Sequence, residues 1–410
     1  MRYTRLLVAA LLAVAVCGTT QANLIWDVET AGGSQINASH EDVEFNPASV
    51  TKVATTWWAL ERLGGDHRFT TLFGYDGSWD REAGVIHGSL VVTGGDDPDF
   101  QPENAFLVAR HLRQLGIRKV DGGIVIQGKF WLGWEGGPFK RSPNPAVRSL
   151  QAGERLLHLL DPDHWTADER AEWEEQCKRR GWDVGDPPAI TVSGEVHLAR
   201  GVLAKPLLRH LSNPLSVILK RFNVFSNNDI ERIADGLGGA AKLQEFLREK
   251  LDDTDHKIRL ETACGEGSNQ MTPKLVVKML REFRRSITAH NLRPRDLLPV
   301  PGCDQGPLPR MFPKLASSDY AGALTLKTGT LDETDGGVAV LAGYVDTIQG
   351  GDTLFCVAAT DAGDKLDRWR KRQQSWLINL MIRIGGVRGK PCGAPMVLSD
   401  AKVEVEGLPD

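Results

Sequence analysis

The sequence predicts an α+β fold in which an antiparallel sheet flanked by helices carries an inserted, mainly β domain. Strand patterns lie at both ends of the chain, at 23–30 and 34–38 and again between 323 and 359. Helical patterns dominate between them, except that the block from 67 to 205 changes to short β-like pieces. A chain of 410 residues is long enough for two domains, each with its own core.

The first helix of the main domain is predicted over 48–63, directly after the two N-terminal strands. Asn46 and Pro47 supply its start signal, apolar residues recur through Leu60, and Gly64 with Gly65 ends it. In the inserted block, β-like pieces alternate with a helix and a second, charged helix. The β-like pieces are expected at 85–92, 122–127 and 189–196, and the helices at 103–115 and 167–180.

The C-terminal half is predicted to hold two helices, a three-stranded antiparallel meander and a last amphipathic helix. These elements are expected at 215–222, 229–237, 323–327, 338–345, 353–359 and 369–384. The three late strands and the two early ones most economically form one antiparallel sheet. Helices from both ends of the chain would then cover that sheet.

Composition is ordinary for a globular protein, with 41% hydrophobic residues, 25% charged residues and a net charge of −4. That balance gives no support to nucleic-acid or anionic-membrane binding, so we expect no nucleic-acid partner. The ten histidines form no His-Glu-x-x-His or other ligand cluster, and the cysteine spacing matches no zinc or redox motif. We therefore expect no metal and no cofactor.

The N-terminus resembles a secretory signal peptide over residues 1–22. Arg2 and Arg5 precede an apolar run at 6–17 that is too short to span a bilayer comfortably, and cleavage is expected after Ala22. Cys17 offers lipidation as an alternative, which we disfavour because the preceding Val16 is larger than lipoprotein processing requires. The mature protein is expected in the periplasm, without a stable membrane span.

Cleavage after Ala22 would leave five cysteines in the mature chain. An odd number in an oxidising compartment leaves at least one cysteine unpaired. The five are Cys177, Cys264, Cys303, Cys356 and Cys392.

Three short motifs in order along the chain point to an enzyme that acylates a serine. They are Ser-Val-Thr-Lys at 49–52, Ser-Asn-Asn at 226–228 and Lys-Thr-Gly at 327–329. Ser49 at a helix start and Lys52 three residues later share one helical face. Lys52 can deprotonate Ser49 only if burial or a nearby cation lowers its pKa, and Lys327 could supply that cation.

Each motif also has a purely structural explanation. Ser49 could be an N-cap beside a solvated lysine, Ser226 and Asn228 could simply form a turn, and Lys327 could end an edge strand. A second Ser-x-x-Lys match, at 399–402, lies in the polar C-terminal tail. The ordered set of three motifs in a secreted chain favours the catalytic interpretation.

With these motifs the chain resembles the D-alanyl-D-alanine carboxypeptidase/endopeptidases, the class C low-molecular-mass penicillin-binding proteins. The resemblance covers most of 23–385 and is weak from 139 to 188. Further segments that resemble the family lie at 46–49, 63–71, 94–98, 222–228, 298–299, 302–308, 327–331 and 341–345.

The resemblance implies a role for each motif residue. Ser49 would be the acylated nucleophile and Lys52 its base, while Ser226 would relay a proton to the leaving amine. Asn228 would orient Lys52 and the substrate amide. The remaining implied roles are carboxylate binding by Lys327 and Thr328, close substrate approach at Gly329, and an oxyanion hole from the backbone N–H groups of Ser49 and Thr330.

The resemblance also implies a serine β-lactamase/transpeptidase-like domain at 23–72 and 206–392, with an inserted domain at 73–205 and a tail at 393–410. The implied activity is a penicillin-sensitive D,D-peptidase, with peptidoglycan peptides and β-lactam antibiotics as partners. A β-lactamase or serine esterase of the same fold, or an inactive cell-wall-binding relative, is the alternative.

Two departures from the family pattern stand out. The 177 positions from Ser49 to Ser226 are fewer than this branch usually has, so part of the insertion is expected to be reduced. The family's Gly-Ser-Gly-Leu-Ser-Arg loop is echoed only by 265–268, without the arginine. Weak selection of the donor side chain is therefore expected.

Overall fold

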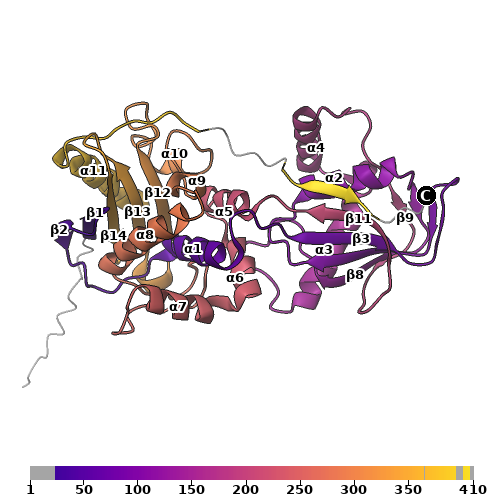
Figure 1. Cartoon of the computed structure of the whole chain (residues 1–410), viewed down its shortest axis with the longest axis horizontal. Helices are drawn as coiled ribbons and strands as arrows, with labels where there is room; N and C mark the ends of the chain where they lie inside the picture. The colour runs from indigo at the N-terminus through magenta and orange to yellow at the C-terminus, as the bar shows by residue number, and fades with distance from the viewer. Residues whose placement is uncertain (1–23, 364, 394–399, 407–410) are drawn as a thin grey trace, which may run out of the picture.

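The computed structural model describes residues 24–363, 365–393 and 400–406, which form two lobes side by side (Figure 1). The expected signal peptide at 1–22, with Cys17, lies outside the described residues. The first lobe contains a five-stranded sheet in the order β12-β13-β14-β1-β2. Its strands are β1 (Leu24–Thr30), β2 (Gln35–Ser39), β12 (Leu324–Leu331), β13 (Val338–Asp346) and β14 (Asp352–Ala359).

All neighbouring strands of this sheet are antiparallel, and β1 pairs with β14 along its whole length. The predicted union of two early and three late strands is therefore confirmed. Alternate residues of β13 enter two cores. Val340 packs with α1 (Thr51–Leu63) and α8 (Pro273–Thr288), whereas Leu341 packs with α11 (Leu366–Arg383).

The remaining helices of the first lobe lie between these sheet-covering helices in sequence. The expected pair of helices at 215–222 and 229–237 is present, joined by a short 3₁₀ turn. The elements are α5 (Leu215–Val224), η3 (Asn228–Ile230), α6 (Glu231–Leu237), α7 (Gly239–Lys250), α9 (Pro294–Leu297) and α10 (Leu308–Met311).

The second lobe is built on a mixed sheet in the order β10-β8-β6-β3-β11-β15, beside a smaller sheet β4-β5-β7-β9. The larger sheet contains β3 (Thr70–Tyr75), β6 (Leu90–Gly95), β8 (Ile124–Lys129), β10 (Val196–Leu198), β11 (Lys205–Leu211) and β15 (Lys402–Val405). The smaller sheet contains β4 (Ser78–Asp80), β5 (Val85–His87), β7 (Lys119–Val120) and β9 (Thr191–Val192).

Three helices accompany these sheets. The expected helices at 103–115 and 167–180 correspond to α2 (Pro102–Gln114) and α4 (Ala167–Arg180). The third, α3 (Pro145–Leu159), was not predicted, although Asn144 caps it through Ala146 N. It falls in the stretch where the family resemblance is weak.

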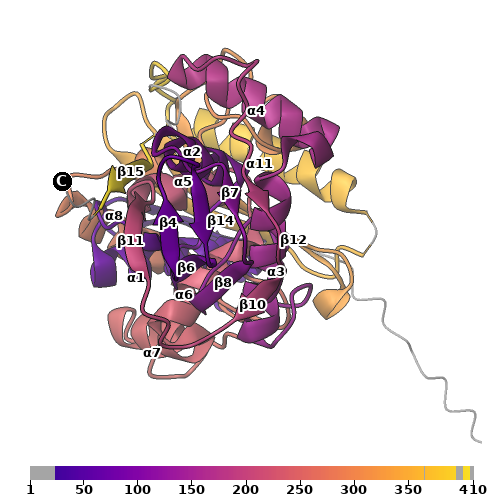
Figure 2. The ribbon, with the colours of Figure 1, turned by 90° about the vertical axis from the view of Figure 1, so that its right-hand side faces the viewer.

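The end of the chain was expected to be a tail, yet residues 402–405 form strand β15 antiparallel to β11. Figure 2 shows β15 beside β11 at the edge of the second-lobe sheet. β3 begins before the expected boundary at 72/73, and β11 spans the boundary at 205/206. The division into domains remains a prediction, and both strands lie in the second-lobe sheet.

In the part of the chain that the structure describes, a disulfide joins Cys303 to Cys392, while Cys177, Cys264 and Cys356 are free and buried. Among the described residues, no helix combines the length and apolar character needed to cross a bilayer.

Candidate active site

Ser49 and Lys52 lie where a 3₁₀ turn, η1 (Ala48–Val50), runs into α1. Lys52 is fully buried, whereas Ser49 is partly exposed. The Lys52 Nζ donates to Ser49 Oγ at 2.8 Å, to Asn228 Oδ1 at 2.6 Å and to the Cys264 carbonyl at 2.6 Å. The nucleophile can therefore meet a ligand while its neighbouring amine is kept from water.

Burial lowers the pKa of Lys52, and the carboxylates of Glu266 and Glu231 only partly oppose this shift. The cause is therefore mainly desolvation rather than the Lys327 cation considered from the sequence. A neutral amine becomes accessible nearer to neutral pH, which is the protonation state that a base requires.

Lys327 on β12 reaches the second motif. Its buried Nζ donates to Ser226 Oγ at 2.8 Å and to the Thr328 carbonyl at 2.9 Å. Burial, together with the charge of Lys52, holds the pKa of Lys327 well below its ordinary value. Ser226 has a φ of 51°, in the left-handed region, at the turn after α5. The structure thus pairs Lys52 with Ser49 and Lys327 with Ser226.

Gly329 brings the edge strand β12 against the start of α1. A Cβ at this position would lie 2.5 Å from the Pro47 carbonyl oxygen and 3.3 Å from Ser49 N. Only glycine allows this approach without displacing the backbone. Ser49 N and the next residue of the strand, Thr330, are therefore brought to the same edge of the site.

Asn228 connects Lys52 to Glu266. The sequence did not reveal this contact between Asn228 and Glu266. Asn228 Nδ2 donates to Glu266 Oε1 at 2.6 Å. Glu231, also unforeseen, accepts from Ala263 N at 3.0 Å and Cys264 N at 2.6 Å. It thereby fixes the loop whose Cys264 carbonyl receives the Lys52 Nζ. No local sequence signal marks Glu231, because its partners lie 32 and 33 residues away.

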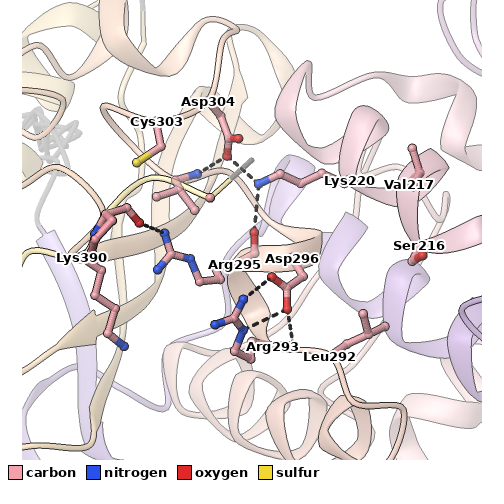
Figure 3. A pocket seen from close by; sticks show the side chains of 13 residues that line it. Ser216, Val217, Lys220, Leu292, Arg293, Arg295, Asp296, Cys303, Asp304 and Lys390 are labelled. Carbon is pink, nitrogen blue, oxygen red and sulfur yellow. Dashed lines mark hydrogen bonds and ion pairs between the residues drawn. The ribbon is translucent and has the colours of Figure 1, made fainter. Parts of the chain in front are cut away.

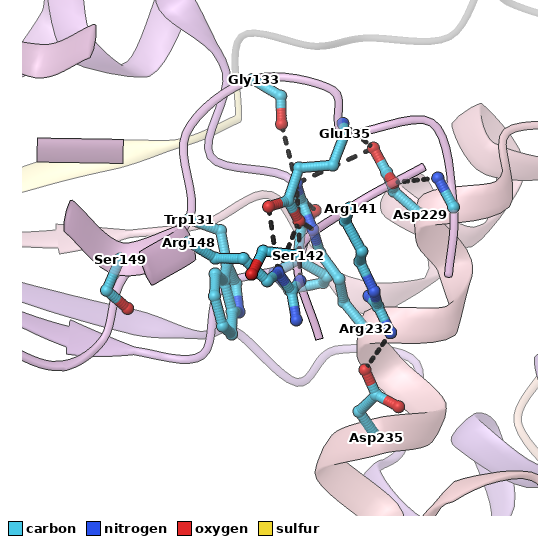
Figure 4. Close-up of polar contacts among 12 residues, drawn as sticks. Trp131, Gly133, Glu135, Arg141, Ser142, Arg148, Ser149, Asp229, Arg232 and Asp235 are labelled. Carbon is cyan, nitrogen blue, oxygen red and sulfur yellow. Dashed lines mark hydrogen bonds and ion pairs between the residues drawn. The ribbon is translucent and has the colours of Figure 1, made fainter. Parts of the chain in front are cut away.

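The second lobe braces the middle motif through Asp229. This buried carboxylate accepts from Glu135 N at 2.7 Å and from Gly137 N at 2.9 Å. The Glu135 side chain in turn binds Arg148 and Arg232, with ion-pair distances of 2.7 and 2.8 Å (Figure 4). Burial would raise the pKa of Glu135, but the two arginines outweigh it and hold the pKa at about 2.

Of the second Ser-x-x-Lys match, the structure describes only the lysine. Ser399 lies outside the described residues, and Lys402 is exposed on β15 in the second lobe. The three predicted motifs, by contrast, come together from α1, the α5–η3 turn and β12.

A separate hollow of about 660 Å³ lies beside α5 and contains none of the motif residues in its lining (Figure 3). Its Lys220 Nζ donates to the carbonyls of Arg295 at 3.0 Å and Leu298 at 2.7 Å and to Asp304 Oδ2 at 2.5 Å. These contacts fix the loop after α9 against the helix that leads to Ser226.

Comparison with protein families gives one match that covers more than half of the chain. The model of the D-Ala-D-Ala carboxypeptidase 3 (S13) family matches residues 9–138 and 187–378. The gap at 139–186 coincides with the stretch where the motif-based resemblance is weak.

Solved structures from two bacteria have the same fold as this chain. A predatory peptidoglycan endopeptidase from Bdellovibrio bacteriovorus has a TM-score of 0.75 at 22% identity, covering 93% of this chain and 98% of its own. The penicillin G-acylated form of that enzyme, in complex with an immunity protein, has a TM-score of 0.73 at 21% identity, covering 94% and 100%. Penicillin-binding protein 4 from Haemophilus influenzae has a TM-score of 0.59 at 17% identity, covering 87% and 96%. At these identities the structures show a shared fold.

Proposed function

The chain belongs to the D-Ala-D-Ala carboxypeptidase 3 (S13) family, and from that membership we propose that it is a serine D,D-peptidase that cleaves peptidoglycan stem peptides through an acyl-enzyme at Ser49. The observation that carries this assignment is the 2.8 Å contact between Ser49 Oγ and a fully buried Lys52 Nζ. Because burial lowers its pKa, this amine is more readily available in the neutral form that takes the serine proton than a solvated lysine would be.

In the acylation step, Lys52 removes the Ser49 proton as Oγ attacks the substrate carbonyl carbon. The scissile C–N bond breaks, and the proton that Lys52 took from Ser49 passes to the leaving amine through Ser226, so that Lys52 becomes neutral again. Ser226 is hydrogen-bonded to Lys327. Backbone N–H groups of Ser49 and Thr330 stabilise the oxyanion. Water then attacks the ester carbonyl as Lys52 takes one of its protons, the bond from that carbon to Oγ breaks, and Lys52 returns the proton to Ser49 Oγ.

The other motif residues hold the substrate in this scheme. Lys327 and Thr328 bind the terminal carboxylate, and Gly329 keeps β12 close enough to Ser49 for both to contact one ligand. Asn228 orients Lys52, because its Oδ1 accepts a hydrogen bond from Lys52 Nζ at 2.6 Å, and it contacts the substrate amide.

The same site would accept a β-lactam, which presents a reactive amide and a carboxylate as acyl-D-Ala-D-Ala does. The signal-like residues 1–22 support secretion to the periplasm, where peptidoglycan stem peptides occur. The acylation of a structural relative by penicillin G supports penicillin sensitivity.

Labelling with penicillin followed by peptide mapping tests the proposal. We expect one adduct, on the peptide that contains Ser49, and its loss in Ser49→Ala. Ser399→Ala is the matched control for the second Ser-x-x-Lys match and should label fully. Folded protein without an adduct would point instead to an inactive cell-wall-binding relative, and an adduct on Ser399 would overturn the site assignment.

A further inference from the structure

A groove between α10 and α11 opens beside the proposed substrate strand. Its volume is about 850 Å³, and residues of both helices line it. Lys314 N donates to Gln374 Oε1 at 2.9 Å, which ties the segment after α10 to the α11 wall. We call this feature the α10–α11 groove.

The charged residues that line the α10–α11 groove are mainly cations, although the whole chain has a net charge of −4. Arg310, Lys314, Arg370 and Lys371 line it together with one carboxylate, Asp367. Arg310, Lys314 and Lys371 are exposed. A concave surface with clustered charge of one sign attracts ligands of the opposite sign.

Arg370 links the groove to the proposed active site. Its Nη2 lies 3.3 Å from Thr330 Oγ1, and Nη1 lies 3.1 Å from Asp367, whose side chain is 88% exposed. Arg370 Nε is buried and has no hydrogen-bond partner among the described residues. The guanidinium thus retains an unused donor in a side chain only 19% exposed.

Arg370 contacts β12 on the face that carries Thr328, one of the two residues proposed to bind the carboxylate. Leu324 and Leu326 pack in the core with α11, so Thr328 and Thr330 share that face. Thr328 is the residue proposed to bind the carboxylate on the leaving side of the scissile bond. The groove therefore begins at the leaving-group end of the substrate.

We propose that the α10–α11 groove, in which Arg370 is the lining residue that contacts β12, binds an anionic peptide on the leaving side of the scissile bond. The preferred substrate is then a peptide cross-link. This inference rests on the proposed D,D-peptidase function. A carboxypeptidase releases a single D-alanine, whose one carboxylate Lys327 and Thr328 already bind. Cleavage of a cross-link releases a whole second stem peptide, whose additional carboxylates match the additional cations.

The test compares kcat/KM for a cross-linked muropeptide dimer with that for a monomeric pentapeptide that has the same acyl part. The wild type should favour the dimer, and Lys314→Gln/Lys371→Gln should reduce the dimer-to-monomer ratio about fivefold, as expected for the loss of exposed ion pairs. A dimer in which only the additional carboxylates are amidated, and the carboxylate beside the scissile bond is left free, should lose the same advantage with the wild type. Arg368→Gln is the matched control, because Arg368 is exposed on α11 but does not line the groove.

Penicillin labelling of Ser49 in each variant separates the two proposals. Normal labelling with an unchanged dimer-to-monomer ratio in Lys314→Gln/Lys371→Gln would overturn the groove assignment and leave the D,D-peptidase intact. Equal wild-type rates on charged and amidated dimers would also overturn it. Absence of labelling and of hydrolysis in the wild type would remove the proposed function itself.

Discussion

Lys52 and Lys327 have similar surroundings but different expected roles. Both are buried, both have lowered pKa values, and each donates to one serine at 2.8 Å. They differ in what else they contact. Lys52 also donates to Asn228, so it connects the first motif to the second. Lys327 instead lies on β12, the strand that is proposed to bind the substrate carboxylate.

Replacement of each lysine should separate these roles. We expect Lys52→Ala to lower the rate of penicillin acylation by about 10²–10⁴-fold, the usual contribution of a general base, with the melting temperature nearly unchanged. Lys327→Ala should mainly raise KM for carboxylate-bearing substrates. Stopped-flow acylation kinetics and steady-state assays measure the two effects. Small, equal losses in both variants would contradict the division of roles.

Asp97 in the second lobe should make stability depend on pH. Burial raises the pKa of Asp97 to about 8, and its Oδ2 has no hydrogen-bond partner among the described residues. The folded protein thus holds a proton that the unfolded chain releases near its ordinary pKa of 3.8. The free energy of unfolding therefore falls as pH rises from about 4 to about 8.

Asp97→Asn mimics the protonated side chain, so we expect it to raise Tm at pH 8 by more than about 2 °C and to change Tm little near pH 4. Differential scanning calorimetry across this range measures the effect. Asp66→Asn, at an exposed position, should leave the profile unchanged. A profile for Asp97→Asn parallel to that of the wild type would contradict the assignment.

Among individual residues, the contacts that could be predicted from the sequence are those that depend on local spacing. Ser49 and Lys52 lie three residues apart where η1 runs into α1, so their contact could be predicted. Contacts of Lys52 with the Cys264 carbonyl, and of Asn228 with Glu266, join residues 212 and 38 positions apart. Neither pair has a periodic signal, so both required the folded chain.

Among the structural elements, the loop at 133–141 gives the second lobe a direct connection to the site. Gly137 has a φ of 95°, and a Cβ there would lie 2.6 Å from the Asn228 Cβ and 2.8 Å from Glu266 Oε2. Gly136 has a similar φ of 81°, but its Cβ would meet only the flexible side chain of Lys140, at 3.1 Å. Gly136 is therefore a matched control for Gly137, because the two positions have a similar φ but differ in what an added Cβ would contact.

We expect Gly137→Ala to lower kcat/KM about 100-fold, because it displaces Asn228 and hence Lys52. Gly136→Ala bears comparable backbone strain and should retain most of the activity. Peptide hydrolysis and thermal unfolding of both variants measure the difference. Equal activity losses would mean that strain in the loop, rather than contact with Asn228, matters.

The elements that sequence reasoning found have strong local patterns. The helix from 48 to 63 has a clear start and stop, and the charged helix at 167–180 agrees with α4. Strand β15 was missed because its Lys-Val-Glu-Val pattern is too short to predict a strand by itself. It becomes a strand through pairing with β11, which no local pattern records.

For the whole molecule, β15 pairs with the outer edge of β11 and becomes the last strand of the second-lobe sheet. Arg209 binds Glu404 and, at 3.2 Å, Glu406, while Glu406 N donates to the Leu207 carbonyl at 2.9 Å. Deletion of residues 400–410 should therefore lower Tm and increase hydrogen exchange along β11. Penicillin labelling of Ser49 in the other lobe should persist. Deletion of 407–410 alone is the control, and unchanged exchange at β11 in the longer deletion would contradict the predicted edge role.

The same strand has a consequence for the order of folding. Arg209 and Glu404 are 195 positions apart, and the intervening residues include most of the first lobe. During synthesis, β11 therefore emerges long before its outer neighbour and must wait with one edge unpaired. Such distant pairing makes strand closure a slow, late event. The second lobe, whose other strands all lie between residues 70 and 211, is consequently the later one to complete its sheet.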